Sequence, residues 1–163
     1  TLAFRDVLHL YSGDKATIHA LEDSVLYAFQ GVSQEGVDGV FDRTFEVREK
    51  YWGTIESMVN RLYAGKRLFF GAGKHTSLEY HCRKLESYYV HSGILFVRLR
   101  AGRGEDRFFE FGPGETLFLP PGLMHQKGGK TDTVFMEIST HDEDSDSFLV
   151  EDGLKIPMPQ LSA

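Results

Sequence analysis

Cysteine is nearly absent from this 163-residue chain: Cys82 stands alone, so no disulfide can form within it. This scarcity is typical of a reducing compartment, and a single thiol also excludes a zinc site built from several cysteines. No run approaches the roughly 18 apolar residues that a transmembrane helix requires. The first residues, TLAFRDVLHL, lack the pattern of a signal peptide. We therefore expect a cytoplasmic protein with no membrane partner.

Positive charge is also in short supply. The chain has 18 lysines and arginines against 24 aspartates and glutamates, which gives a formal net charge of -6. Non-specific binding to nucleic acid or to an anionic membrane needs the opposite balance, so both partners are unlikely on charge grounds and we expect no nucleic-acid partner. A small anionic ligand in a local basic pocket stays compatible with this charge.

Glycine and aromatic residues, in contrast, are plentiful, with 17 glycines and 13% aromatics. This composition favours β structure with many turns. From about residue 64 onward, short apolar or alternating runs are separated by Gly- and Pro-containing turns, a pattern typical of a sandwich or barrel. We predict strands over residues 66–70, 75–81, 86–91, 93–99, 107–111, 115–119 and 132–139. We read the segments 71–73, 92–93, 101–106, 112–114, 120–122 and 127–130 as the breaks between them.

The first part of the chain is less regular. In residues 45–63, the apolar side chains at 55, 58, 59 and 62 follow helical spacing, although a strand fits part of the same segment. Strand-like residues 23–29 resemble residues 132–138, either by chance or because the N-terminus is a vestigial half-repeat. We therefore predict three parts: an N-terminal strand extension over residues 1–44, a barrel over 45–153 and a loosely held tail over 154–163.

Two charged clusters interrupt the predicted strands. The first is Glu79-x-His81-x4-Glu86, in which Glu79 and His81 share a strand face because side chains alternate. The second leaves a strand, turns on Pro-Pro-Gly and presents His125. Two carboxylates buried side by side repel each other, whereas two imidazoles and two carboxylates converging from different strands suit a divalent metal. We predict that Glu79, His81, Glu86 and His125 bind such an ion.

The spacing of both clusters resembles that of the cupin family. The first cupin motif, G-x5-H-x-H-x(3,4)-E-x6-G, is matched by Gly73-x5-Glu79-x-His81-x4-Glu86-x6-Gly93, with Glu79 in place of the first histidine. The second, G-x5-P-x-G-x2-H-x3-N, is matched by Gly114-x5-Pro120-x-Gly122-x2-His125, with Gly129 in place of the asparagine. The resemblance implies an all-β fold: a cupin double-stranded β-helix, or jelly-roll barrel, with extra N-terminal strands.

One branch of cupins is a closer match. The run TSLEYH at 76–81 resembles the S-L-Q-x-H run of the phosphomannose-isomerase-like branch, and EKYWG at 49–53 resembles its Pro-Trp-Gly segment. Lys84 resembles the basic residue that the branch places two before the ligand Glu86. Glutamate for glutamine at position 79 keeps an oxygen donor but adds negative charge, which favours Zn, Mn, Fe or Ni and weakens the ion as a Lewis acid. Glu79 is alternatively a base that contacts the substrate.

Three further residues are candidates for catalysis: Lys84, His75 and Tyr88. Lys84 lies two residues before a predicted ligand, and Tyr88 shares a strand face with Glu86, although a core aromatic fits Tyr88 equally well. His75 shares a face with Glu79 and His81 and lines either the barrel mouth or a solvent-facing strand end. Any of the three could move a proton at the substrate.

The branch resemblance implies a metal-dependent isomerase acting on a sugar or sugar phosphate in carbohydrate metabolism. Two other classes stay open: another cupin metal enzyme, such as a dioxygenase or lyase acting on a small organic acid, and a non-catalytic domain that binds its ligand through the metal. Cupins of this kind are often dimers, so the resemblance also implies a homodimer.

Overall fold

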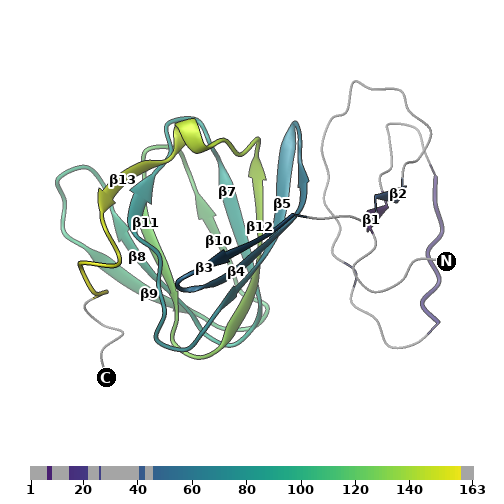
Figure 1. Cartoon of the computed structure of the whole chain (residues 1–163), viewed down its shortest axis with the longest axis horizontal. Coiled ribbons are helices and arrows are strands. Elements are labelled where there is room, and N and C mark those ends of the chain that lie inside the picture. The colour runs from purple at the N-terminus through teal and green to yellow at the C-terminus, as the bar shows by residue number, and fades with distance from the viewer. Residues whose placement is uncertain (1–6, 9–14, 22–25, 27–40, 43–45, 159–163) are drawn as a thin grey trace. The chain divides into compact units, whose positions relative to one another are not determined.

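A computed structural model describes residues 7–8, 15–21, 26, 41–42 and 46–158 (Figure 1). The chain divides into two compact units, Thr1–Phe45 and Glu46–Ala163. In the first unit, strands β1 (Val7–Leu8) and β2 (Phe41–Asp42) form an antiparallel pair. Of the strand-like residues 23–29, from which the half-repeat alternative was drawn, the structure describes only residue 26.

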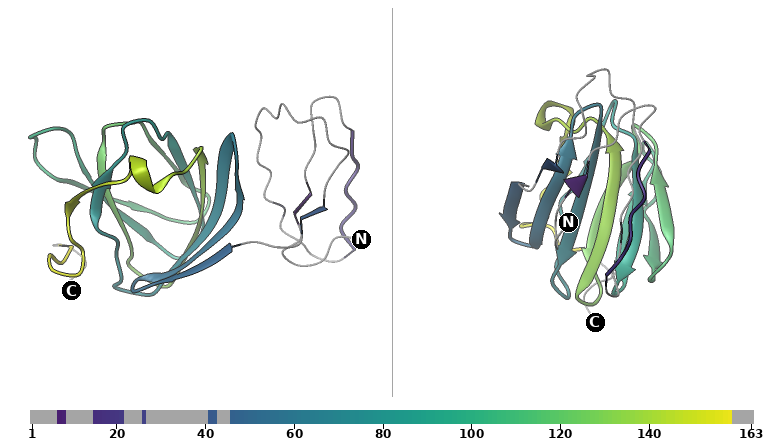
Figure 2. Two further views of the ribbon diagram at one scale, coloured as in Figure 1. Left: turned by 45° about the horizontal axis from the view of Figure 1, so that its top comes forward. Right: turned by 90° about the vertical axis from the view of Figure 1, so that its right-hand side faces the viewer.

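Two antiparallel sheets form the second unit, and Figure 2 shows them facing each other around a common interior. The six-stranded sheet has the order β10-β7-β12-β5-β4-β3, and its members are β3 (Glu46–Lys50), β4 (Gly53–Asn60), β5 (Tyr63–Phe70), β7 (Glu86–Ser92), β10 (Thr116–Leu119) and β12 (Thr133–Thr140). The five-stranded sheet has the order β13-β6-β11-β8-β9, and its members are β6 (Leu78–Tyr80), β8 (Leu95–Arg100), β9 (Arg107–Phe111), β11 (Met124–Gly129) and β13 (Phe148–Glu151). A short 3-10 helix, η1 (Asp144–Asp146), joins β12 to β13.

Most predicted strands are confirmed within a few residues, and β9 matches its prediction at both ends. The helical alternative for residues 55–62 is wrong, because residues 53–60 form β4. A β-bulge between Ser57 and Val59 breaks the alternation there, and this removes the signal that marks a strand. The break predicted at 127–130 is also wrong for its first three residues, which continue β11.

The barrel interior is divided into an apolar half and a charged half. Side by side on β5, β12 and β7, Leu68, Phe135 and Val90 form one row of register partners. Two residues along, the next row brings Lys66 beside Glu137 and Glu137 beside Tyr88. The apolar half comprises Trp52, Ile55, Leu68, Phe70, Val90, Leu95, Val97, Leu119 and Phe135, with Tyr88 at its border.

The motif glycines sit where the chain turns sharply. Gly93 has a φ of 79°, and a Cβ there would collide with the carbonyl oxygen of Asp132. Gly122 has a φ of 81°, which lets the Pro-Pro-Gly turn reverse the chain before His125. The spacing that the sequence motifs preserve is therefore the spacing of these turns.

Among the described residues, no helix has the length and apolar character that crossing a membrane would demand.

Candidate metal centre

The predicted donors come from both sheets. His125 lies on β11 and is the register partner of Glu79 on β6, so both side chains project from the same face of the five-stranded sheet. His81 follows β6 directly, and Glu86 begins β7 in the opposite sheet. Residues 82–85 make the turn that carries the chain from one sheet to the other, which places Glu86 opposite the histidines.

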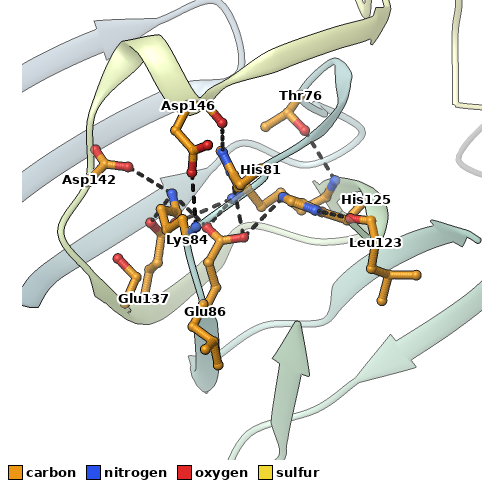
Figure 3. A network of polar contacts seen from close by, with 12 residues as sticks. Thr76, His81, Lys84, Glu86, Leu123, His125, Glu137, Asp142 and Asp146 are labelled. Atoms are coloured by element: carbon orange, nitrogen blue, oxygen red, sulfur yellow. Dashed lines mark hydrogen bonds and ion pairs between the residues drawn. The ribbon is translucent and has the colours of Figure 1, made fainter. Parts of the chain in front are cut away.

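The side chains of His81, Glu86 and His125 meet inside the barrel (Figure 3). One ligand atom each from Glu79, His81 and His125 lie within 4.8 Å of one another. Glu86 Oε2 lies 3.2 Å from His125 Nε2 and 3.8 Å from His81 Nε2. His81, Glu86 and His125 are buried, whereas Glu79 is partly exposed. Glu79 is therefore the donor residue that is most accessible to solvent.

Both histidines are held in the tautomer that a metal requires. His81 Nδ1 lies 2.8 Å from the carbonyl oxygen of Asp146, and His125 Nδ1 lies 3.0 Å from that of Leu123. A carbonyl oxygen only accepts, so each Nδ1 carries a hydrogen, and in the neutral ring Nε2 is then the nitrogen that presents a lone pair. Burial lowers the pKa of His125 below its usual value, which keeps this ring neutral as metal binding requires.

Asp146 on η1 holds the turn that carries His81. Its carboxylate accepts hydrogen bonds from the backbone N–H groups of Cys82, Arg83 and Lys84, at 3.0, 3.1 and 2.9 Å. The Pro-Pro-Gly turn adds a fourth contact, because the N–H of Gly122 donates to the carbonyl oxygen of His81 at 2.7 Å. The two sequence motifs are thus joined through the backbone as well as through their donors.

Three buried lysines lie beside the donors and pair with carboxylates. Lys84 Nζ lies 2.8 Å from Glu86 Oε1, 2.8 Å from Asp142 Oδ1 and 3.3 Å from Glu137 Oε1. Lys127 Nζ lies 3.3 Å from Glu137 Oε2 and contacts the Tyr88 hydroxyl at 2.7 Å. Lys66 is the third and pairs with Glu137 and Asp142.

Opposite charges outweigh burial in this network. Burial alone would lower the pKa of Lys84 and of Lys127, but the carboxylates of Glu137 and Glu86 raise both above the usual lysine value. Burial alone would raise the pKa of Glu137, but the three lysines hold it well below its usual range. Lys84, Lys127 and Glu137 are therefore ionised at neutral pH.

The predicted catalytic residues are placed very differently. Lys84 faces the interior and contacts the donor Glu86, whereas Tyr88 is a buried residue at the border of the apolar half. His75 is not brought to the donors: it contacts Gln126, whose side chain lies on the opposite face of β11 from His125, and its Nε2 faces the backbone N–H of Met158. The prediction that His75 shares a strand face with His81 assumed a strand over residues 75–81. The strand β6 begins only at Leu78, so the alternation of side chains does not extend to His75.

Sequence reasoning missed Lys127, Glu137, Asp142 and Asp146. Lys127 stands before two glycines and resembles part of a turn, and the run at 142–146 resembles a solvated acidic loop. The alternation of β11 was the available signal, because it places Lys127 on the same face as His125.

The donor set fits a divalent metal. His81 Nε2 and His125 Nε2 are buried and have no hydrogen-bond partner among the described residues. With Nδ1 protonated on both rings, two lone pairs face the negative oxygen Glu86 Oε2, an arrangement that is repulsive without a cation between them. Two imidazole nitrogens and carboxylate oxygens are ligands that Zn, Mn, Fe and Ni accept.

Comparison with known proteins identifies the fold. No family model matches the chain. Glucose-6-phosphate isomerase from Thermococcus onnurineus (strain NA1) is 26% identical over 126 residues, which cover 76% of this chain and 58% of that protein. The chain thus spans just over half the length of this curated relative.

Two solved structures are similar to the barrel. CapF, the capsular polysaccharide assembling protein of Staphylococcus aureus, superposes with a TM-score of 0.60 at 18% identity, over 66% of this chain and 32% of that one. Oxalate decarboxylase from Bacillus subtilis gives a TM-score of 0.59 at 17% identity, over 65% and 30%. Both have the cupin fold, and the all-β barrel described above has it too.

Proposed function

We propose that this chain is a metal-dependent cupin enzyme that isomerises a sugar or a sugar phosphate. The observation that carries the proposal is the convergence of two Nε2 lone pairs and Glu86 Oε2 on one buried point, with the partly exposed carboxylate of Glu79 beside it. The likeness to a glucose-6-phosphate isomerase supports the sugar substrate.

A divalent ion bound by His81, His125, Glu86 and Glu79 would supply Lewis-acid polarisation of a sugar carbonyl. Aldose–ketose isomerisation also needs a group that takes the proton from C2 and returns it to C1. Glu79 is the best candidate in this chain, because it is the donor that lies partly open to solvent.

The other candidates suit this role less well. Lys84 keeps its proton, because the neighbouring carboxylates raise its pKa, so it cannot act as a base at neutral pH. Burial raises the pKa of Tyr88 well above its usual value, so its hydroxyl stays protonated as well. Both residues are better suited to holding a negative charge near the donors than to abstracting a proton.

The metal itself is tested first. Protein purified without chelator should carry a stoichiometric transition metal by elemental analysis, and His125→Ala should lose most of it. His91→Ala is the matched control, because His91 is an exposed histidine on β7. A parent protein free of transition metal, and unable to take one up, would remove the site hypothesis.

The reaction is tested separately on metal-loaded protein. Incubation with aldoses and sugar phosphates in deuterated water should exchange the C2 proton of at least one substrate. Glu79→Gln should slow this exchange by about 100-fold or more while metal affinity falls much less, since an amide oxygen still donates. Glu110→Gln, at an exposed carboxylate on β9, should leave exchange unchanged.

The possible outcomes separate the alternatives. No exchange with any sugar would reject the isomerase. Metal-dependent sugar binding without turnover would indicate a non-catalytic binding domain. Oxygen uptake by the iron-loaded protein with a small organic acid would indicate a dioxygenase.

A further inference from the structure

The two carboxylate oxygens of Glu86 have different surroundings. Oε2 faces the histidines, at 3.2 Å from His125 Nε2 and 3.8 Å from His81 Nε2. Oε1 faces two ammonium groups, at 2.8 Å from Lys84 Nζ and 3.9 Å from Lys127 Nζ. The oxygen that points toward the histidines is thus free to bind a cation, and the other is already paired with positive charge (Figure 3).

The ammonium groups of Lys84 and Lys127 are each held by further contacts besides Glu86. Lys84 Nζ is held by Asp142 and Glu137, and Lys127 Nζ is held by Glu137 and the Tyr88 hydroxyl. Both residues are about 95% buried, so neither ammonium group can swing out into water. Their charges therefore act on Glu86 at short range and in a poorly screened interior.

The charges of the network balance without Glu79. Lys66, Lys84 and Lys127 carry three positive charges, and Glu86, Glu137 and Asp142 carry three negative ones. When a divalent ion binds, only the carboxylate of Glu79 remains to offset its two charges. The centre then keeps one net positive charge.

We propose that Lys84 and Lys127 are positioning residues that commit Glu86 to bind the metal through Oε2 alone and leave the loaded centre positively charged, so that it prefers an anionic oxygen-donor ligand over a neutral one. This inference rests on the metal-binding part of the proposed function and is independent of the reaction. It narrows the substrate class to compounds that present a carboxylate, a phosphate or an ionised hydroxyl to the metal.

The experiment uses manganese-loaded protein and two small probes of similar size. Glycolate is an anionic two-carbon oxygen donor, and ethylene glycol is its neutral counterpart. Displacement of metal-bound water, followed by proton relaxation, gives the Kd of each probe, and electron paramagnetic resonance reports the symmetry of the manganese site. The parent protein should bind glycolate at least tenfold more tightly than ethylene glycol.

Lys84→Met frees Oε1 and removes one positive charge. We expect manganese to bind more tightly, its resonance spectrum to change as Glu86 becomes bidentate, and glycolate affinity to fall about tenfold. Lys66→Met is the matched control, because Lys66 is also a buried lysine of the network but its ion pairs go to Glu137 and Asp142 rather than to Glu86. Lys66→Met removes the same unit of charge but from a lysine that does not contact Glu86, so it should leave the spectrum as in the parent and lower glycolate affinity by about threefold or less, less than Lys84→Met does.

Folding is checked independently by thermal unfolding. In Lys84→Met, Asp142 and Glu137 each keep at least one lysine partner, so the barrel should still form. If it does not, Lys84→Arg and Lys127→Gln replace it: arginine should preserve the preference for glycolate, and glutamine should weaken it.

Three results would overturn the inference. They are equal binding of both probes by the parent, equal effects of Lys84→Met and Lys66→Met, and an unchanged preference in Lys127→Gln. A parent that binds no manganese or other divalent metal would instead reject the proposed metal centre, whereas failure of sugar isomerisation alone would leave the positioning role standing.

Discussion

The two halves of the barrel interior bury different kinds of side chain, apolar in one half and charged in the other. In the apolar half, the rings of Trp52 and Phe70 stack with their centroids 4.3 Å apart. The centroid of the Phe135 ring lies 5.7 Å from that of Phe70. In the charged half, the same strands β5 and β12 bury Lys66 and Glu137 instead. Burying apolar rings stabilises a fold directly, whereas a buried ion pair roughly breaks even against its desolvation cost. The apolar half therefore holds the barrel together, and the charged half serves the donors.

Phe135→Ala should have the largest effect on stability. Its ring is fully buried between Phe70 and Tyr88, so the cavity should cost about 3–5 kcal/mol in the free energy of unfolding measured with urea. Phe118→Ala is the control, because this ring on β10 is 58% exposed and its loss should cost less than about 0.5 kcal/mol. Equal losses for the two variants would show that the apolar half is not the main source of stability.

Asp146→Ala should affect both stability and the centre. Its removal leaves three backbone N–H groups of residues 82–84 without their acceptor, at a cost of about 2–3 kcal/mol. Metal affinity should fall by roughly 10–100-fold, since the carboxylate holds the turn after His81 against η1 and so keeps the Asp146 backbone carbonyl in place to orient the His81 ring. Asp144→Ala, at an exposed aspartate of the same helix, should change neither urea unfolding nor metal titration. Loss of stability with unchanged metal affinity would contradict the link between η1 and His81.

A second ionic cluster contains charges but none of the predicted metal donors. Its members are Arg98, Arg100, Asp106 and Glu151. Arg100 Nε donates to Asp106 Oδ1 at 2.7 Å, and this hydrogen bond is the main reason that the pKa of Asp106 falls to about 2. The ionised form is favoured in the folded state, so its stabilisation is complete above the unfolded pKa of about 4 and is lost as the pH falls toward 2.

The predicted effect at Asp106 is the smallest. Because the side chain is 22% exposed and screened by water, Asp106→Asn should cost about 1 kcal/mol at pH 7. About half of this difference should remain at pH 3. Urea unfolding of both proteins from pH 7 to pH 3 measures it, and a gap that widens on acidification would show that the sign is wrong.

Most strands were predictable from the sequence, and so was the approach of Glu79, His81, Glu86 and His125 to one another, because turns and alternation are local properties of the chain. That these four residues bind a metal stays a prediction. Lys127 and Asp146 escaped because their roles depend on partners far along the sequence: Lys127 pairs with residues of β7 and β12, and Asp146 bonds residues more than 60 positions earlier. Local patterns carry no information on such pairings. The oligomeric state, the cytoplasmic location and the metal identity stay predictions.

The hydrogen bonds that Asp146 makes to residues 81–84 affect the stage of synthesis at which the protein can bind a metal. All four predicted donors are translated before residue 126, but the carbonyl that orients His81 and the carboxylate that holds its turn arrive 65 residues after His81. A nascent chain that has reached only Thr140 therefore contains all four predicted donors but lacks Asp146, whose contacts orient His81 and hold its turn. We expect ion capture to wait until η1 emerges and docks, so that an unfinished barrel does not commit to whichever cation it meets first.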